Sequence, residues 1–197
     1  MTSGLRERKK LATRLSIHRA ALQLVAERGL GVSVEDIAER AEVSPRTFFN
    51  YFPSKDDAIL GLDPAASHHM VEAFLARPAT EAPVRALRAV AAAQAAEMAE
   101  ETELWPLRMR VIEAHPALLG RLAAAFGQSE RAMATAIAQR TGTSVDAGIY
   151  PMLLAGVAAA ATRSALHRWL ATDFTASFPD LVDEAWDVLS AGLPAPR

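Results

Sequence analysis

The segment of residues 33–55 constrains the fold of this chain more than any other. It reads S-V-E-D-I-A-E-R-A-E-V-S-P-R-T-F-F-N-Y-F-P-S-K. Ser33 is followed three positions later by Asp36, a spacing close to a capping box, which predicts a helix that begins directly after Ser33. Ser44 and Pro45 suit the N-cap and first position of a second helix, where the missing proline N–H costs nothing. Two short helices joined by a tight turn are therefore predicted, the arrangement that places a helix in the major groove of DNA.

The second of these helices has two different faces. Phe48 and Phe52 are four residues apart, so they share one face and are predicted to anchor the helix in the core. On the other face, Arg46 can form a forked pair with guanine, Asn50 can pair with adenine, and Phe49 can pack on a thymine methyl group. The same pattern also fits a helical hairpin in an ordinary bundle, in which this face would be a solvated surface.

A second group of residues precedes and overlaps this segment: Thr13-Arg14, Ile17, Ala20-Ala21, Leu24, Gly29, V-S-V-E-D-I-A and A-E-V-S-P-R-T-F-F-N-Y-F-P-S-K. With these residues, positions 11–60 closely resemble the N-terminal domain of TetR-family transcriptional regulators. This resemblance implies an all-α protein with a three-helix helix-turn-helix domain at residues 1–57. It also implies a larger helical domain at residues 58–197 that binds an effector, forms a homodimer and causes release of DNA when the effector binds.

The resemblance also assigns roles within the helix-turn-helix. Positions that hold DNA phosphates in the family correspond to Ser33, Ser44, Thr47, Tyr51 and Lys55. Positions that face base edges correspond to Pro45, Arg46, Phe49 and Asn50.

The segment departs from the family pattern at two positions. Glu42 occupies the turn position that is usually glycine. A left-handed conformation there is strained for a residue with a Cβ by roughly 1 kcal/mol, and the residue adds a negative charge beside the predicted DNA-facing helix. Phe49 stands where tyrosine is common, so a phosphate contact by that hydroxyl is absent.

The net charge of the chain is −2, which by itself does not indicate nucleic-acid binding. The charge is uneven, however, because residues 1–19 hold six basic residues, Arg6 and Arg8 among them, and the single acidic residue Glu7. An arm directed at DNA phosphates is one interpretation of this N-terminus, and a solvated, disordered tail is the other.

Several classes of protein fit the composition poorly. The chain has no cysteine, so disulfides and thiolate metal sites are excluded. The N-terminus lacks the apolar stretch of a secretory signal, and the run of about 14 apolar residues from Ile149 to Thr162 is shorter than a membrane span. We therefore expect a cytoplasmic protein with no membrane association.

The rest of the chain is alanine-rich, and proline and glycine mark its helix boundaries. A first helix is predicted from Leu5 or Lys9 to Arg28, and the helix after Ser54 is predicted to break or kink near Asp63-Pro64. A motif, W-P-L-R-M-R-V-I-E-A-H-P-A-L-L, resembles a subgroup of actinobacterial regulators whose C-terminal domain is described as acyl-CoA-like ligand binding. Further helices are predicted at 82–100, 103–114, 116–141, 145–171 and 179–192.

Large apolar residues on the middle helices are candidates for an effector pocket, with arginines that could orient a polar head. Ordinary core packing explains the apolar residues equally well. Arg163 lies on the otherwise apolar stretch 152–166 and is the best single candidate for a functional polar group, although a partner carboxylate from another helix would explain it equally well. The candidates are Trp105, Arg108, Met109, Ile112, Phe126, Met133, Met152 and Arg163.

The last two predicted helices are candidates for a dimer interface, since the resemblance implies a four-helix contact between two copies. A two-fold dimer fits a palindromic operator. The alternative is packing within one chain. The candidate interface residues are Leu153, Val157, Ala161, Leu181, Ala185, Trp186 and Leu189.

Enzymatic function is not expected. His68, His69 and Glu72 fall close together on a predicted helix, but no H-E-x-x-H, phosphate loop or G-x-S-x-G motif is present. No catalytic residue, metal site or cofactor is therefore predicted. The favoured function is a DNA-binding regulator, most simply a repressor, whose partners are a palindromic operator and a small apolar effector that could be acyl-CoA-like. The alternatives are a helical adaptor that binds no DNA and, less favoured, a helical enzyme.

Overall fold

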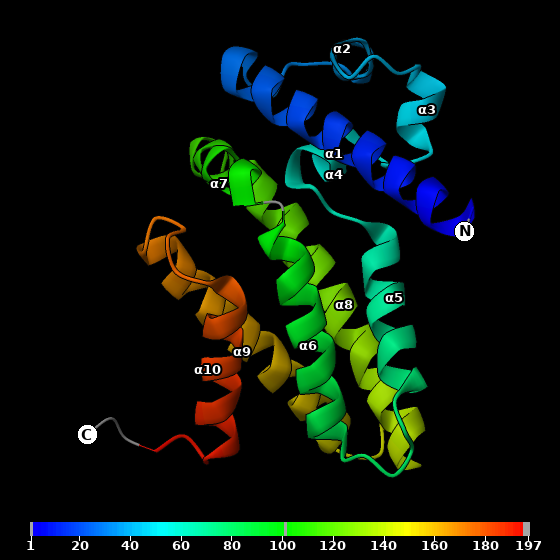
Figure 1. Cartoon of the computed structure of the whole chain (residues 1–197), viewed down its shortest axis with the longest axis vertical. Coiled ribbons are helices and arrows are strands. Elements are labelled where there is room, and N and C mark those ends of the chain that lie inside the picture. Colours follow the sequence, from blue (N-terminus) through cyan, green and yellow to red (C-terminus); the bar gives the residue numbers. More distant parts are fainter. Residues whose placement is uncertain (1, 101, 195–197) are drawn as a thin grey trace. The chain divides into compact units, whose positions relative to one another are not determined.

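The structure, a computed structural model, describes residues 2–100 and 102–194, without the side chains of residues 2–7 and Pro64. The described residues form helices and no strands, which confirms the predicted all-α class (Figure 1). A short 3-10 helix, Thr102–Leu104, precedes α7. The α-helices are α1 (Thr2–Arg28), α2 (Val34–Arg40), α3 (Pro45–Phe49), α4 (Lys55–Leu60), α5 (Pro64–Ala76), α6 (Pro83–Ala99), α7 (Trp105–Ala114), α8 (Ala117–Thr141), α9 (Tyr150–Ala171) and α10 (Phe178–Ser190).

The chain divides into two compact units. The first unit comprises Met1–Pro64 together with Leu104–Ala125, and the second comprises Ala65–Glu103 together with Phe126–Arg197. These are packing units, and α8 contributes its first residues to one and its later residues to the other. The functional division expected after residue 57 therefore remains a prediction about activity rather than a description of this packing.

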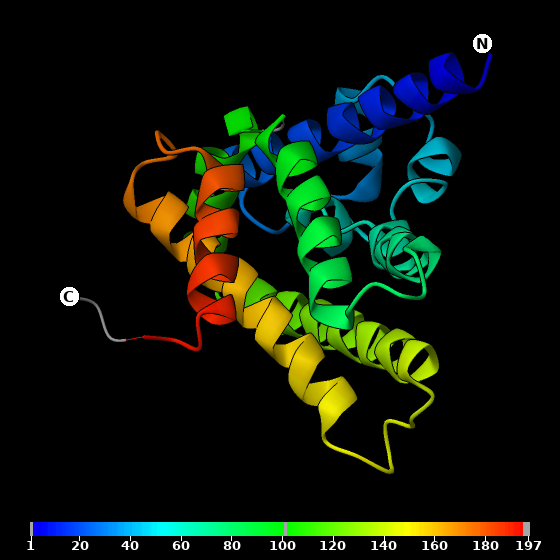
Figure 2. The ribbon, with the colours of Figure 1, turned by 60° about the horizontal axis from the view of Figure 1, so that its bottom comes forward.

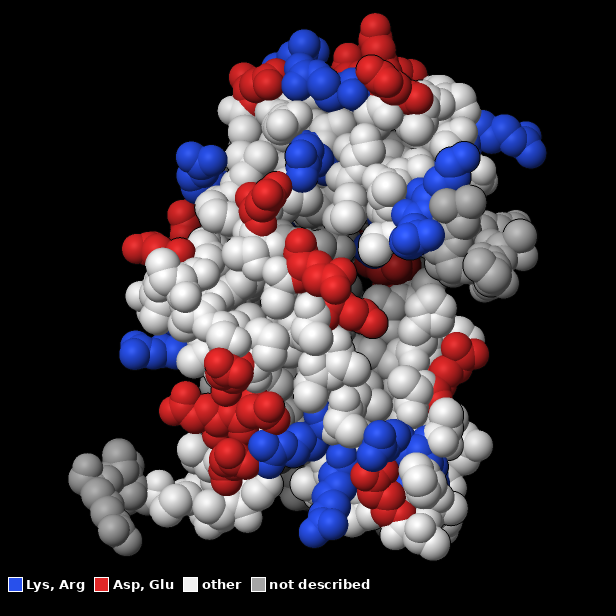
Figure 3. All heavy atoms as spheres, viewed as in Figure 1, with Lys and Arg blue, Asp and Glu red and all other residues white. Residues whose placement is uncertain are grey.

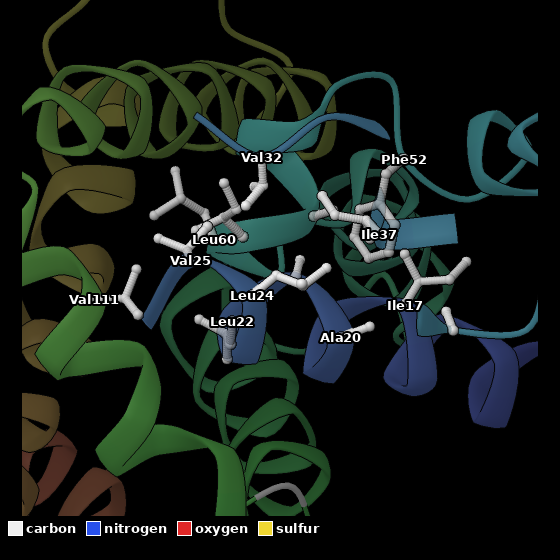
Figure 4. Packing of buried hydrophobic residues seen from close by; sticks show 14 of the residues in the cluster. Ile17, Ala20, Leu22, Leu24, Val25, Val32, Ile37, Phe52, Leu60 and Val111 are labelled. Carbon is white, nitrogen blue, oxygen red and sulfur yellow. The ribbon is translucent and has the colours of Figure 1, made fainter. Parts of the chain in front are cut away.

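The core of the first unit is built on α1, which packs against α2, α4 and α7. Ile17 and Leu24 on α1 lie close to Ile37 and Phe52, while Val111 comes from α7 (Figure 4). All five side chains are buried. Removal of this apolar surface from water holds the short helices α2, α3 and α4 in place, since helices of this length are not stable alone.

The predicted break near residue 63 is confirmed. Helix α4 ends at Leu60, where Gly61 adopts the left-handed conformation (φ 62°) that commonly terminates helices. Pro64 then opens α5, consistent with the preference of proline for the first helical position.

In the second unit, α10 packs against both α9 and α6 (Figure 2). Its amphipathic sequence buries Phe178, Val182 and Trp186, and Trp169 of α9 packs on Phe178 with ring centroids 4.8 Å apart. The predicted start of α9 at residue 145 is wrong. The helix begins at Tyr150, because Pro151 has no N–H and is accommodated only in the first turn.

The surface is of mixed charge. On the face shown in Figure 3, lysine and arginine side chains lie among aspartate and glutamate, with uncharged atoms between them. Among the described residues, no helix combines the length and apolarity needed to cross a membrane.

Candidate nucleic-acid interface

Helix α2 begins with the predicted capping box. The Ser33 backbone N–H donates to the Asp36 carboxylate at 2.8 Å, and the Asp36 N–H donates to the Ser33 hydroxyl at 3.0 Å. The hydrogen bonds from the Ser33 hydroxyl and backbone lower the pKa of Asp36. The start of α2 is therefore fixed by the side chains of two residues three positions apart.

Helix α3 begins as predicted, with Ser44 as N-cap and Pro45 at the first position. The Thr47 N–H donates to the Ser44 hydroxyl at 3.0 Å, and the Ser44 and Thr47 hydroxyl oxygens are 2.8 Å apart. Both predicted phosphate ligands are thus held together at the helix start.

The two faces of α3 differ as the sequence predicts. Phe48 and Phe52 are fully buried. Phe49 is 56% exposed, although its ring packs edge-on against Phe48 with centroids 5.4 Å apart. Arg46 and Asn50 are exposed beside it, and Asn50 forms the C-cap. The remaining predicted contact residues are exposed Pro45 and half-buried Tyr51, which packs against the core.

The turn between α2 and α3 contains the strained residue that the resemblance predicts. Glu42 has a φ of 55° and an exposed side chain. Backbone hydrogen bonds hold this conformation: the Glu42 N–H donates to the Glu39 carbonyl at 3.0 Å and the Val43 N–H to the Ala38 carbonyl at 2.9 Å. The turn keeps its geometry without glycine.

Lys55 has a structural role that sequence reasoning missed. Its ammonium donates to the backbone carbonyls of Leu30 at 2.7 Å and Val32 at 3.1 Å. The side chain thereby joins the start of α4 to the loop that follows α1. Any contact of Lys55 with a DNA phosphate would be made from this position.

Polar contacts join α1 to α4 and to the loop that follows it. Arg14 donates to the Gly61 carbonyl at 3.0 Å and pairs with Asp63 at 2.9 Å. The Nδ1 atom of buried His18 lies 2.7 Å from the Ala58 carbonyl. Burial lowers the pKa of His18 to about 3, with further lowering by the charges of Arg108 and Arg14. Sequence reasoning missed this cluster, although a histidine directly after buried Ile17 was a signal.

The basic N-terminal residues belong to the first turns of α1. Lys9 and Lys10 are exposed on that helix, as is Arg8. Arg6 and Glu7 lie outside the described side chains.

The predicted effector-pocket residues are divided between the two units. Trp105 and Ile112, with the neighbouring Met109, belong to the packing of the first unit, and the Arg108 guanidinium lies 4.5 Å from the centroid of the Trp105 ring. The second unit holds half-buried Met133 and Met152, exposed Phe126, and Arg163.

Arg163 is accessible to solvent. The sequence singles it out as a polar residue on an otherwise apolar stretch, and its side chain is exposed in a shallow depression on α9 that it shares with Ala160, Ser164 and His167. The apolar stretch around Arg163 is a helix with one buried face and one exposed face, and the arginine lies on the exposed face.

The predicted dimer residues also differ in accessibility. Leu153 is 55% exposed and Val157 is half-buried, whereas Ala161 is buried. Trp186 is fully buried within its own chain, so its assignment to an intermolecular surface is wrong: α10 points this side chain inward. The other α10 candidates, Leu181, Ala185 and Leu189, are half-buried.

Two family models match the chain. Residues 17–60 match the N-terminal model of bacterial regulatory proteins of the TetR family, and residues 81–194 match the model described as the MftR C-terminal domain. The second match spans more than half of the chain.

Two relatives are similar over most of their length. The chain is 32% identical over 173 residues to the HTH-type transcriptional regulator TcmR of Streptomyces glaucescens, with 84% of this chain and 76% of TcmR covered. It is 30% identical over 188 residues to MftR of Mycobacterium tuberculosis, a candidate regulator of mycofactocin biosynthesis, with 94% and 93% covered. Both relatives are described as transcriptional regulators.

Solved structures share the fold at lower identity. SmeT, the repressor of a Stenotrophomonas maltophilia multidrug efflux pump, gives a TM-score of 0.57 at 20% identity, with 93% of this chain and 96% of SmeT covered. FadR of Bacillus subtilis in complex with stearoyl-CoA gives a TM-score of 0.56 at 17% identity, with 91% and 98% covered. Together with the helix-turn-helix geometry, the two family models and the two relatives show that the chain is a DNA-binding transcriptional regulator of the TetR family.

Proposed function

We propose that this protein is a homodimeric repressor that binds a palindromic operator and leaves it when a small, largely apolar effector binds. The observation that carries the proposal is the outer face of α3. Arg46 and Phe49 of α3 and its C-cap residue Asn50 are exposed, and the helix is anchored by buried Phe48 and by buried Phe52, which follows it. An exposed phenylalanine between an arginine and an asparagine has little reason to face water, whereas all three can contact base edges.

In this proposal, the side chains around that face hold the DNA backbone. Ser33 and Ser44 cap α2 and α3 with their hydroxyls at the helix N-termini, where the free N–H groups favour phosphate. The other proposed contacts with DNA phosphates are made by Thr47, Tyr51 and Lys55. Pro45 lies beside Arg46 and faces the base edges with it.

The outward face of α9 is proposed to form the dimer contact. Leu153 is exposed there, Val157 is half-buried one turn later, and Ala160 with Ser164 continues the face with small side chains. Small residues permit two helices to approach closely, and a two-fold contact between identical surfaces gives the symmetry that a palindrome requires.

An apolar effector is proposed from the composition of the C-terminal part and from the ligands of structural neighbours. Among those neighbours, one FadR protein binds stearoyl-CoA, another binds lauroyl-CoA, and SmeT binds triclosan. Release of DNA requires only a modest coupling between effector and operator, about 1–3 kcal/mol, or a 5- to 150-fold loss of affinity.

The experiment uses DNA selected from a random pool by the purified protein. Fluorescence anisotropy then measures operator affinity with lauroyl-CoA, stearoyl-CoA or triclosan, while calorimetry measures whether each compound binds. At least one compound that binds is expected to weaken operator affinity more than fivefold. A compound that binds without changing operator affinity would contradict effector release, and failure to enrich any DNA would favour the adaptor function.

Replacement of Arg46 by alanine is expected to cost roughly 1–3 kcal/mol of operator binding and to relax sequence preference at one position of each half-site, because a bidentate arginine contact carries that information. Binding to a library of single-position operator variants measures both effects. An equal loss for every sequence would instead assign Arg46 to a phosphate.

Replacement of Glu42 by glycine is expected to stabilise the fold by about 1 kcal/mol, since glycine accepts the positive φ without strain. It should also tighten DNA binding, because a negative charge near the phosphates is lost. Glu42→Gln removes the charge and keeps the strain, so it should tighten binding without raising the melting temperature. Equal melting temperatures for Glu42→Gly and Glu42→Gln would show that the positive φ of Glu42 does not strain the backbone.

A further inference from the structure

A buried carboxylate at the start of α4 accepts hydrogen bonds at both of its oxygens. Asp57 is 1% exposed. One of its oxygens, Oδ1, accepts hydrogen bonds from Arg121 Nε at 2.9 Å and Nη2 at 2.7 Å. The other, Oδ2, accepts from the Ser54 hydroxyl at 2.7 Å. A carboxylate this deeply buried needs a compensating charge, and Arg121 provides one.

On one side, this ion pair is tied to the helix-turn-helix. Only residues 50–54 separate the end of α3 from the start of α4. Ser54 caps α4, and Lys55 bonds the same end to the carbonyls of Leu30 and Val32. A shift of Asp57 would therefore move the end of α3, the helix proposed to contact the bases, together with the loop before α2.

On the other side, Arg121 belongs to a long helix. Helix α8 runs without interruption from Ala117 to Thr141, and its residues from Phe126 onward belong to the second unit. No flexible linker separates Arg121 from that part of the chain. Continuous secondary elements of this kind are physical carriers of coupling between sites.

The two partners differ in their access to water. The Arg121 side chain is 45% exposed, whereas Asp57 is closed off. Water can therefore solvate the arginine if α8 shifts, while the carboxylate would be left without its partner. Loss of the contact would therefore cost free energy mainly at the Asp57 carboxylate, which links the position of α8 at Arg121 to the position of α4.

We propose that the Asp57–Arg121 ion pair is the positioning contact through which α8 sets the orientation of α3 for operator binding. Arg121 acts through α4 and touches no DNA. This inference rests on the proposed function, because it concerns how the proposed effector-binding part controls the helix-turn-helix.

The test uses the absence of cysteine from the chain. A spin label at Glu39→Cys, an exposed position on α2, reports the distance between the two helix-turn-helix segments of the dimer. Arg121→Gln is compared with Arg131→Gln, which changes an exposed arginine on the same helix. Operator affinity and its salt dependence are measured on the unlabelled proteins.

Arg121→Gln is expected to broaden the label–label distance distribution and to weaken operator binding at least tenfold. The salt slope should stay the same, because no phosphate contact is lost. Arg131→Gln should change neither quantity by more than twofold. A changed salt slope for Arg121→Gln would assign the residue to DNA and overturn the proposal.

A second variant covers the case in which Arg121→Gln fails to fold because Asp57 is left charged. Asp57→Asn combined with Arg121→Met removes both charges and keeps an oxygen for Ser54, so it should fold, with broadened distances and weak operator binding. Wild-type distances and affinity in this folded double variant would overturn the proposal. Failure of the unmodified protein to bind DNA would instead contradict the proposed function.

Discussion

Replacement of Gly61 by alanine lowers the free energy of unfolding by roughly 2–5 kcal/mol in our expectation, from two costs that act together. Gly61 has a φ of 62°, which costs a residue with a Cβ about 1–2 kcal/mol. An added Cβ would also lie 2.9 Å from two atoms of the His18 ring, and overpacking typically costs about 1–3 kcal/mol. The ring cannot swing aside, because it is buried and bonded to the Ala58 carbonyl.

Gly29 provides the matched control. It has a similar φ of 73°, but an added Cβ would meet nothing within 4 Å. Gly29→Ala should therefore cost only the conformational term, about 1–2 kcal/mol. Urea denaturation of both variants measures the difference, and a His18→Ser background should remove the additional loss at Gly61. Equal losses at the two glycines would show that the close approach to His18 does not exist.

The protein is also expected to lose stability in mildly acidic solution through His18. Its pKa is lowered from 6.5 to about 3, first by burial and then by the charges of Arg108 and Arg14. The folded state therefore keeps His18 neutral, while the unfolded state takes up a proton below about pH 6.5. The stabilisation that this group contributes is fully present above pH 6.5 and is lost as the pH falls toward 3, at about 1.4 kcal/mol per pH unit.

At pH 5 the expected loss from this residue is about 2 kcal/mol relative to pH 7.5. His18→Gln cannot titrate in this range, so the difference in unfolding free energy between the two proteins should change with pH by that amount. Carboxylates common to both proteins cancel in the comparison. Parallel pH profiles for the two proteins would mean that His18 is protonated in the folded state or is not buried.

The sequence could predict those parts of the structure that are determined by residues close to one another along the chain. Ser33, Ser44 and Ser54 cap helices three residues before their partners, and Gly61 with Pro64 ends one helix and begins the next. Phe48 and Phe52 were assigned to the core from their spacing alone. Each of these features depends on side chains within a few positions along the chain.

Features that depend on distant packing could not be predicted in this way. His18 and Ala58, or Asp57 and Arg121, meet only after α1, α4 and α8 have packed together. Periodicity identifies the faces of a helix, but not which face a neighbouring helix covers. That limit explains why periodicity alone places Trp186 on the predicted dimer surface, although the side chain is buried within its own chain.

Two copies of this helix-turn-helix are proposed to bind the two halves of a palindrome together. Selection of bound DNA from a random pool, followed by hydroxyl-radical footprinting of the enriched sites, tests it most directly. The expected result is two inverted half-sites whose centres are about 10–10.5 base pairs apart or a multiple of that spacing, with affinity that falls steeply with salt. Enrichment of single, unpaired sites, or binding with no sequence preference, would contradict it.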